Sequence, residues 1–147
     1  MSLTLDASVV VAANRAAEPH HAASRQLLDA ALHQAARFFC PTLLIPECAA
    51  AISRATRETV EAAGLVEDTR RMAHMRLISL DETLAVRGAE IAMNCRIRGA
   101  DAVYVAVAEL FGTTLITWDG EILERAPAVV PTMTPADWLA LKAGQPG

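Results

Sequence analysis

A chain of 147 residues is long enough to bury one sizeable core and too short for two domains of typical size. Hydrophobic residues make up 53% of the sequence and aromatic residues only 4%, which predicts a core built from Ala, Val, Leu and Ile. The net charge of -4 argues against a broad basic surface that binds nucleic acid by bulk attraction, but not against an acidic nuclease site.

Short apolar runs alternate along the chain with longer segments whose apolar residues recur at helical spacing. In chain order, these segments predict a strand at 3–5, a helix from 7, a helix at about 20–35, a strand at 42–45, a helix at about 46–54, a helix at 56–75, a strand at 77–80, a helix from 81 to about 95, a central helix from 101 to 111, a strand at 113–117, a short helix at 121–125, a small strand at 129–130 and a closing helix from 134 to 144. Strands separated by helices favour right-handed crossovers, so we expect a parallel sheet between helical layers.

Four acids stand at the ends of these predicted elements. Asp6, Glu47 and Asp119 fall where predicted strands end, and Asp101 opens the helix that leads into the strand before Asp119. The carboxyl ends of parallel strands meet at one edge of a sheet, so the four acids are expected to converge there. Carboxylate clusters without nitrogen or sulfur ligands select hard cations such as Mg²⁺ or Mn²⁺. Such ions can activate water against a phosphodiester, which is the chemistry that this pattern fits best.

Each acid alone also has a purely structural interpretation. Asp6 and Asp101 are suitable N-caps, and Glu47 in a first helical turn complements the helix dipole. Four acids at the same sheet edge favour a functional site, because capping gives no reason for them to converge. Adjacent His20 and His21 would face different ways on a helix, so we interpret them as a solvated helix start and not as metal ligands.

Cysteine content and hydropathy bear on where the protein works. Three cysteines without CxxC spacing, namely Cys40, Cys48 and Cys95, suit reduced core thiols. No apolar run approaches the roughly 18 uncharged residues of a membrane span, and the N-terminus lacks a positively charged leader. We therefore expect a soluble, cytoplasmic protein without a membrane partner.

Several motifs in order carry a resemblance to a known family. The strand end LTLDAS, the turn PTLLIPE and the run GADAVYVAVAELFGTTLITWD resemble the PIN domain, specifically its bacterial VapC toxin branch. The resemblance extends from Leu3 to about Val130. It implies a three-layer α/β/α sandwich with a mostly parallel sheet of four to five short strands. On this basis we expect a single domain over 1–147, with its core at about 3–131 and a C-terminal helix at about 135–143.

The resemblance also implies an activity and partners. A protein of this kind is expected to be a Mg²⁺-dependent endoribonuclease, with Mn²⁺ as a substitute, and the toxin of a type II toxin-antitoxin pair. It implies an RNA substrate, a cognate antitoxin protein and a homodimer. The antitoxin is expected to lay a segment across the acidic groove and to place an arginine near the metal.

Individual positions match the family motif. Asp6, Glu47, Asp101 and Asp119 match the acidic quartet that binds metal and positions the attacking water, with Asp6 and Asp101 as the expected direct ligands. Ser8 and Thr117 match hydroxyl residues that support this quartet. Trp118 departs from the family, because a smaller or polar residue is expected there. Only Arg96 and Arg98 provide positive charge close to the quartet in the sequence.

Two other functions are compatible with the residues. In a phosphatase or phosphotransferase on an α/β sheet, Asp6 would act as the nucleophile, but no lysine precedes Asp119 to bind the phosphate. A catalytically silent binding module could use the same fold to hold a partner. The presence of all four acids argues against this last interpretation.

Overall fold

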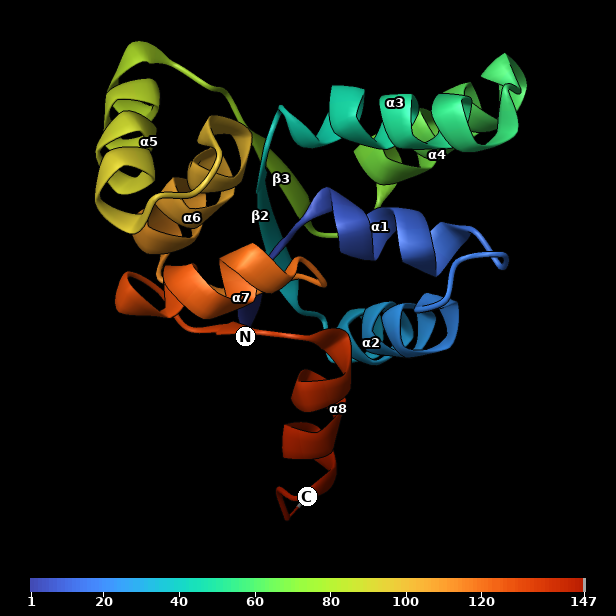
Figure 1. The fold of residues 1–147 in the computed structure, drawn as a ribbon. Helices are drawn as coiled ribbons and strands as arrows, with labels where there is room; N and C mark the ends of the chain where they lie inside the picture. Colours follow the sequence, from blue (N-terminus) through green and yellow to red (C-terminus); the bar gives the residue numbers. More distant parts are fainter. Residues whose placement is uncertain (147) are drawn as a thin grey trace.

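A computed structural model describes residues 1–146, in which short strands alternate with helices as expected (Figure 1). The strands are β1 (Ser2–Leu5), β2 (Arg37–Pro41), β3 (Met75–Ile78), β4 (Thr114–Ile116) and β5 (Thr132–Met133). The helices are α1 (Ala7–Asn14), α2 (His21–His33), α3 (Leu44–Thr56), α4 (Thr59–Arg71), α5 (Glu82–Cys95), α6 (Gly99–Phe111), α7 (Gly120–Arg125) and α8 (Pro135–Ala143), with a turn of 3-10 helix, η1, at Ala126–Ala128. Within the described residues, no helix is both long and apolar enough to span a bilayer.

All neighbouring strands in the sheet are parallel, and their order is β3-β2-β1-β4-β5. The chain therefore starts in the middle of the sheet, extends it on one side through β2 and β3, and returns to add β4 and β5 on the other side. The direction of winding changes between β1 and β4. In open parallel sheets, ligands bind beyond the carboxyl ends of the strands at this switch point.

Helices cover both faces of the sheet, which confirms the expected α/β/α sandwich. Helix α6 packs against β1, β2 and β4 and is itself covered by α5. Helices α1 to α4 form the other layer, and α8 leaves the body of the molecule beside α2 (Figure 1). From Asp101 to Ala108 every residue of α6 is buried, because the sheet and α5 enclose this helix. A buried helix that begins beside the carboxyl edge of the sheet carries Asp101 to that edge.

The boundary between β2 and α3 differs from the expectation. The segment 42–45 is not a strand, because β2 is Arg37–Pro41 and Leu44 already begins α3. An apolar run of four residues has no periodicity that separates a strand from a buried helical turn. The aromatic pair Phe38 and Phe39 favours the strand, and the amide of Thr42 closes the pairing with β3 by donating to the Ile78 carbonyl at 2.9 Å.

Three other boundaries also differ. The helix predicted at 56–75 is shorter, because α3 extends to Thr56, Arg57 adopts a left-handed φ of 58°, and α4 is Thr59–Arg71. The third strand begins at Met75, two residues early, directly after His74 with φ 62°. The last strand is Thr132–Met133 and not 129–130, since Val130 lies in the core after η1. Local backbone turns at these non-glycine residues leave no clear signal in composition.

Two predicted helix starts are confirmed in detail. Asp81 caps α5 by accepting a hydrogen bond from the Leu84 amide at 2.9 Å. At the start of α8, Thr134 and Asp137 form a reciprocal capping box, with Pro135 in the first turn. Asp81 and Asp137 therefore have structural roles.

Candidate active site

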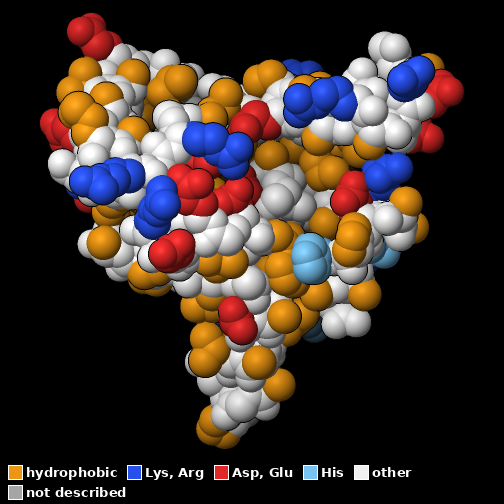
Figure 2. All heavy atoms as spheres, in the orientation of Figure 1, with side chains coloured by type: hydrophobic (Ala, Val, Ile, Leu, Met, Phe, Trp, Pro, Cys, Tyr) orange, Lys and Arg blue, Asp and Glu red, His pale blue; other side chains and the backbone are white. Residues whose placement is uncertain are grey.

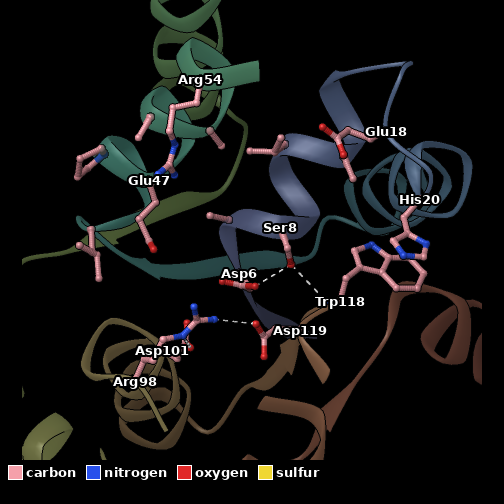
Figure 3. Close-up of a pocket in the computed structure, with 17 residues that line it drawn as sticks. Asp6, Ser8, Glu18, His20, Glu47, Arg54, Arg98, Asp101, Trp118 and Asp119 are labelled. Atoms are coloured by element: carbon pink, nitrogen blue, oxygen red, sulfur yellow. Dashed lines mark hydrogen bonds and ion pairs between the residues drawn. The ribbon is translucent and has the colours of Figure 1, made fainter. Parts of the chain in front are cut away.

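The four predicted acids come together at the carboxyl edge of the sheet, although they belong to four different segments. Asp6 follows β1, Asp119 lies shortly after β4, and Glu47 and Asp101 stand in the first turns of α3 and α6. All four line one cavity of about 560 Å³ (Figure 3). Figure 2 shows acidic side chains gathered near the middle of this face, with basic side chains, drawn in blue, bordering them.

Asp6 is held by the two hydroxyl residues that the family motif marks as supporting groups. Leu5 pairs in register with Ile116, so Asp6 and Thr117 leave the sheet side by side. The Asp6 Oδ2 atom accepts hydrogen bonds from Ser8 Oγ at 2.7 Å and from Thr117 Oγ1 at 2.9 Å. Asp6 occupies the N-cap position of α1, yet its side chain caps no amide. The capping interpretation therefore fails for Asp6.

Burial destabilises the ionised form of the Asp6 carboxyl group. Only 6% of the residue is exposed, and this desolvation raises the pKa of Asp6 above its ordinary value. The two hydroxyl hydrogen bonds oppose the rise in pKa, and the negative charge of Asp119 adds to it. A buried acid beside a second acid is a favourable position for a cation.

Glu47 is oriented by a residue that the sequence interpretation missed. Tyr104, which is fully buried on α6, donates its hydroxyl to Glu47 Oε1 at 2.6 Å. Desolvation raises the pKa of Glu47, and the tyrosine hydrogen bond partly offsets this rise. A signal was present: Tyr104 is the only hydroxyl on an aliphatic helix, three residues after Asp101 and so on the same face.

Arg98 forms ion pairs with two acids of the quartet. Its Nε donates to Asp101 Oδ2 at 3.0 Å, and its Nη2 donates to Asp119 Oδ2 at 3.0 Å. Asp101 is 8% exposed, and burial raises its pKa while Arg98 opposes that rise. The Arg98 side chain is itself 70% exposed, so these ion pairs add little to stability. Arg98 thus neutralises two carboxylates from an accessible position.

Asp119 both caps a helix and lines the acidic cavity. Its Oδ1 atom accepts hydrogen bonds from the amides of Glu121 and Ile122 at 2.9 and 3.0 Å, which caps α7. Its other oxygen, Oδ2, faces Arg98. Thr117 Oγ1 accepts a hydrogen bond from the Asp119 amide at 3.0 Å, so one hydroxyl positions both Asp6 and Asp119.

The donor chemistry of the quartet fits a hard divalent cation. The carboxylates offer oxygen ligands only, which are the ligands that hard divalent cations prefer. Burial together with mutual repulsion raises the pKa of Asp6, Glu47 and Asp101, and a bound cation would offset this repulsion. Among residues 1–146, no group of three Asp, Glu, His or Cys side chains lies close enough together to hold a metal ion in the observed arrangement. Arg98 holds the position between Asp101 and Asp119 instead.

The rings of His20 and Trp118 form one wall of the same cavity. Their centroids are 3.8 Å apart and their planes differ by 9°, so the two rings are stacked. Trp118 Nε1 donates to Ser24 Oγ at 2.8 Å, and the Trp118 amide donates to Ser8 Oγ at 3.2 Å. His20 is therefore more than the solvated helix start that was expected. Its neighbour His21 faces elsewhere, with Nδ1 at 2.7 Å from the Ala12 carbonyl.

The fold and the site define an α/β/α protein with an acidic cavity at the switch point of a parallel sheet. The sequence profile of the PIN domain matches residues 3–128. The chain belongs to the PIN domain family. No curated protein shows significant sequence similarity to the chain.

Solved structures with the same fold share little sequence with this chain. VapC20 of Mycobacterium tuberculosis, a sarcin-ricin loop cleaving toxin, is 14% identical, with a TM-score of 0.72 over 83% of this chain and 93% of that one. VapBC2 of Rickettsia felis, bound to a DNA fragment from its promoter, is 12% identical, with a TM-score of 0.69 over 91% and 98%. A toxin-antitoxin complex from Klebsiella pneumoniae is 15% identical, with a TM-score of 0.64 over 90% and 97%. At such identities the likeness establishes the fold alone.

Proposed function

We propose that the protein is a metal-dependent endoribonuclease that hydrolyses RNA phosphodiester bonds, and that it is the toxin of a type II toxin-antitoxin pair. The observation that carries the proposal is the convergence of Asp6, Glu47, Asp101 and Asp119 in one cavity at the sheet switch point. Two of these acids, Asp6 and Asp101, are almost fully buried and cap no helix with their side chains. Membership of the PIN domain family supports this assignment.

Mg²⁺ is the proposed cofactor, and Mn²⁺ is expected to substitute for it. Asp6 and Asp101 are proposed as direct ligands, and Glu47 and Asp119 as ligands that act directly or through water. When bound, such a cation supplies Lewis-acid chemistry at the phosphate and makes a nearby water more acidic. We expect Arg98 to leave its two carboxylates when a cation takes its place, because the guanidinium and the ion compete for the same oxygens.

The side chains around the quartet have distinct proposed roles. Ser8 and Thr117 fix the Asp6 carboxylate through Oδ2, and Tyr104 fixes Glu47. Such partners orient metal-binding carboxylates, and their loss typically weakens metal affinity by about 10–100-fold. Arg98, with five N–H donors and an exposed side chain, is suited to bind a substrate phosphate in a bidentate manner.

The experiment that tests this function is cleavage of a mixed RNA pool by the purified protein in Mg²⁺ or Mn²⁺. We expect cleavage that EDTA abolishes and that the Asp101→Asn variant lacks. Asp29→Asn is the matched control, because Asp29 lies outside the cavity on the exposed surface of α2. Cleavage that persists in EDTA or in Asp101→Asn would contradict the proposal, and activity restricted to phosphomonoesters would favour a phosphatase.

Two partners follow from the same proposal. We expect a homodimer, which light scattering during gel filtration detects as twice the chain mass of 15.7 kDa. We also expect a cognate antitoxin that places an arginine at the acidic cavity, where it would compete for the carboxylates that Arg98 contacts. Substitution of that antitoxin arginine by alanine should restore RNA cleavage in the complex.

A further inference from the structure

The stacked rings of His20 and Trp118 have no role in the chemistry proposed above. Both rings line the cavity that holds the acidic quartet, and Trp118 immediately precedes Asp119 (Figure 3). We propose that this aromatic stack is a nucleobase subsite: a base next to the cleaved phosphodiester stacks on the exposed His20 ring. The inference rests on the proposed ribonuclease function and adds where a base of the single-stranded substrate binds.

The stack is fixed in place before any ligand arrives. Trp118 is held at its indole nitrogen by Ser24, a fully buried residue of α2, and at its backbone amide by Ser8. His20 lies parallel to the indole at a centroid distance of 3.8 Å. A rigid aromatic surface loses little conformational entropy on binding, so it contributes more of its contact energy to affinity.

The position of the stack relative to the acids favours a nucleic-acid base over other flat ligands. Ser8 Oγ donates to Asp6 and accepts from the Trp118 amide, so one hydroxyl joins the aromatic wall to the acidic centre. A phosphodiester held at the quartet would place its neighbouring nucleoside against this wall. Single-stranded RNA is commonly recognised by bases that stack on aromatic side chains, including histidine.

Stacking on His20 explains how an acidic protein obtains affinity for RNA. The side chains that line the cavity include two arginines, Arg54 and Arg98, and four quartet acids, so attraction to the phosphates alone is weak. Base stacking does not depend on net charge and tolerates any base, because every base has a π face. The wall therefore supplies affinity without requiring a particular base.

The test compares two RNAs with the same charge. The probe is a labelled single-stranded RNA of about twelve nucleotides that contains a bond cleaved in the pool assay, and its partner has abasic riboses on both sides of that bond. Binding is measured by fluorescence polarisation with Asp101→Asn, which keeps the RNA intact. We expect loss of the two bases to weaken binding about tenfold. In Asp101→Asn with His20→Ala, the two RNAs should bind within about twofold of each other.

Two further variants separate stacking from other roles of His20. His20→Phe keeps an aromatic face and should preserve the difference between the two RNAs. His33→Ala is the matched control, because His33 is an exposed histidine at the far end of α2 and does not line the cavity. It should preserve the difference as well.

Several results would overturn the inference. Equal binding of both RNAs by Asp101→Asn would show that no base is held. An equal loss for both RNAs in His20→Ala would assign the stack to structural packing, and an effect on antitoxin binding alone would assign it to a protein partner. If the unaltered protein in Mg²⁺ neither binds nor cleaves any RNA, the ribonuclease function itself fails and the subsite fails with it.

Discussion

Buried hydroxyl groups decide how the quartet carboxylates are presented. Tyr104 is enclosed by the core, and its hydroxyl donates a hydrogen bond to Glu47. A phenol in the centre of an aliphatic helix costs desolvation, so its position is explained by the carboxylate that it orients. Tyr104 is therefore proposed to act through Glu47 as a positioning residue.

Tyr104→Phe tests this role. The substitution keeps the ring and removes the donor, so we expect a stability loss of about 1 kcal/mol and a Mn²⁺ affinity lower by about tenfold. Calorimetric titration with Mn²⁺ measures the affinity. Thr69→Val is the control, because it also deletes a buried hydroxyl, one that donates to the Leu65 carbonyl at 2.7 Å, but on α4. If both variants bound Mn²⁺ as the unaltered chain does, Tyr104 would have only a packing role.

The raised pKa values of the site acids set the pH dependence of stability. Burial raises the pKa of Asp6, Glu47 and Asp101 in the folded protein above the ordinary values of these carboxyl groups. The folded state then binds these protons more tightly than the unfolded state. The contribution of these three acids to the stability of the folded state is fully present below the pKa values of the unfolded chain. It is lost as the pH rises through the pKa values of the folded protein. The metal-free site therefore opposes folding at neutral pH.

Asp6→Asn should stabilise the metal-free protein at neutral pH. The amide removes a buried charge and its repulsion by Asp119 while retaining an oxygen for Ser8 and Thr117, so we expect a gain of about 1 kcal/mol. Urea unfolding in EDTA at neutral pH and near pH 5 measures it, and the gain should shrink at the lower pH. A gain that stayed constant with pH would mean that the Asp6 charge is not the cause. Added Mn²⁺ should stabilise the unaltered chain more than the variant.

At the scale of elements, the end of α6 brings the chain back into the sheet. Gly112 adopts a left-handed φ of 62° directly after Phe111, and β4 begins two residues later. A side chain at Gly112 would meet no atom within 4 Å, so the backbone conformation alone requires glycine here. The turn matters for the site because β4 leads to Thr117 and Asp119.

A pair of glycine substitutions at uncrowded positions separates backbone strain from helix propensity. Gly112→Ala should lower the unfolding free energy by about 1 kcal/mol, because alanine is disfavoured at left-handed φ. Gly64→Ala should raise it by about 0.5–1 kcal/mol, since Gly64 lies within α4 and also has open space around it. Denaturant unfolding measures both. Effects of the same sign would mean that helix propensity and φ do not govern these positions.

For the whole molecule, the charge distribution predicts that RNA binding depends only weakly on salt concentration. The net charge is -4, and the basic residues that line the cavity are Arg54 and Arg98. Two phosphate contacts release few counterions, so the logarithm of the binding constant should fall with a slope of about −1.4 against the logarithm of salt concentration.

Titrations of Asp101→Asn with single-stranded RNA at several salt concentrations measure this slope. Arg54→Ala should make the slope shallower by about 0.7, which corresponds to one lost phosphate contact. Arg70→Ala is the control, because Arg70 pairs with Glu67 on α4 outside the cavity. A slope much steeper than predicted would point to a larger basic surface, contributed by a second copy or by residues beyond the cavity.

The sequence by itself determined the alternation of strands and helices and the four acids at the ends of those elements. Both follow from local chemistry: apolar periodicity marks the elements, and acids at the edges of apolar segments are conspicuous. Local chemistry failed where a short apolar run fitted two structures, as at 42–45, and where non-glycine residues such as Arg57 and His74 adopt left-handed φ.

Only the tertiary structure decided what surrounds those acids. The hydrogen bond from Tyr104 to Glu47 joins residues 57 positions apart, and the pairing of Arg98 with Asp119 spans 21 positions. The stack of His20 on Trp118 likewise unites the start of α2 with the end of β4. These contacts depend on the order of strands in the sheet and on the directions of side chains across it. A linear pattern of residues does not encode either, because both are fixed only when the helices and strands pack together.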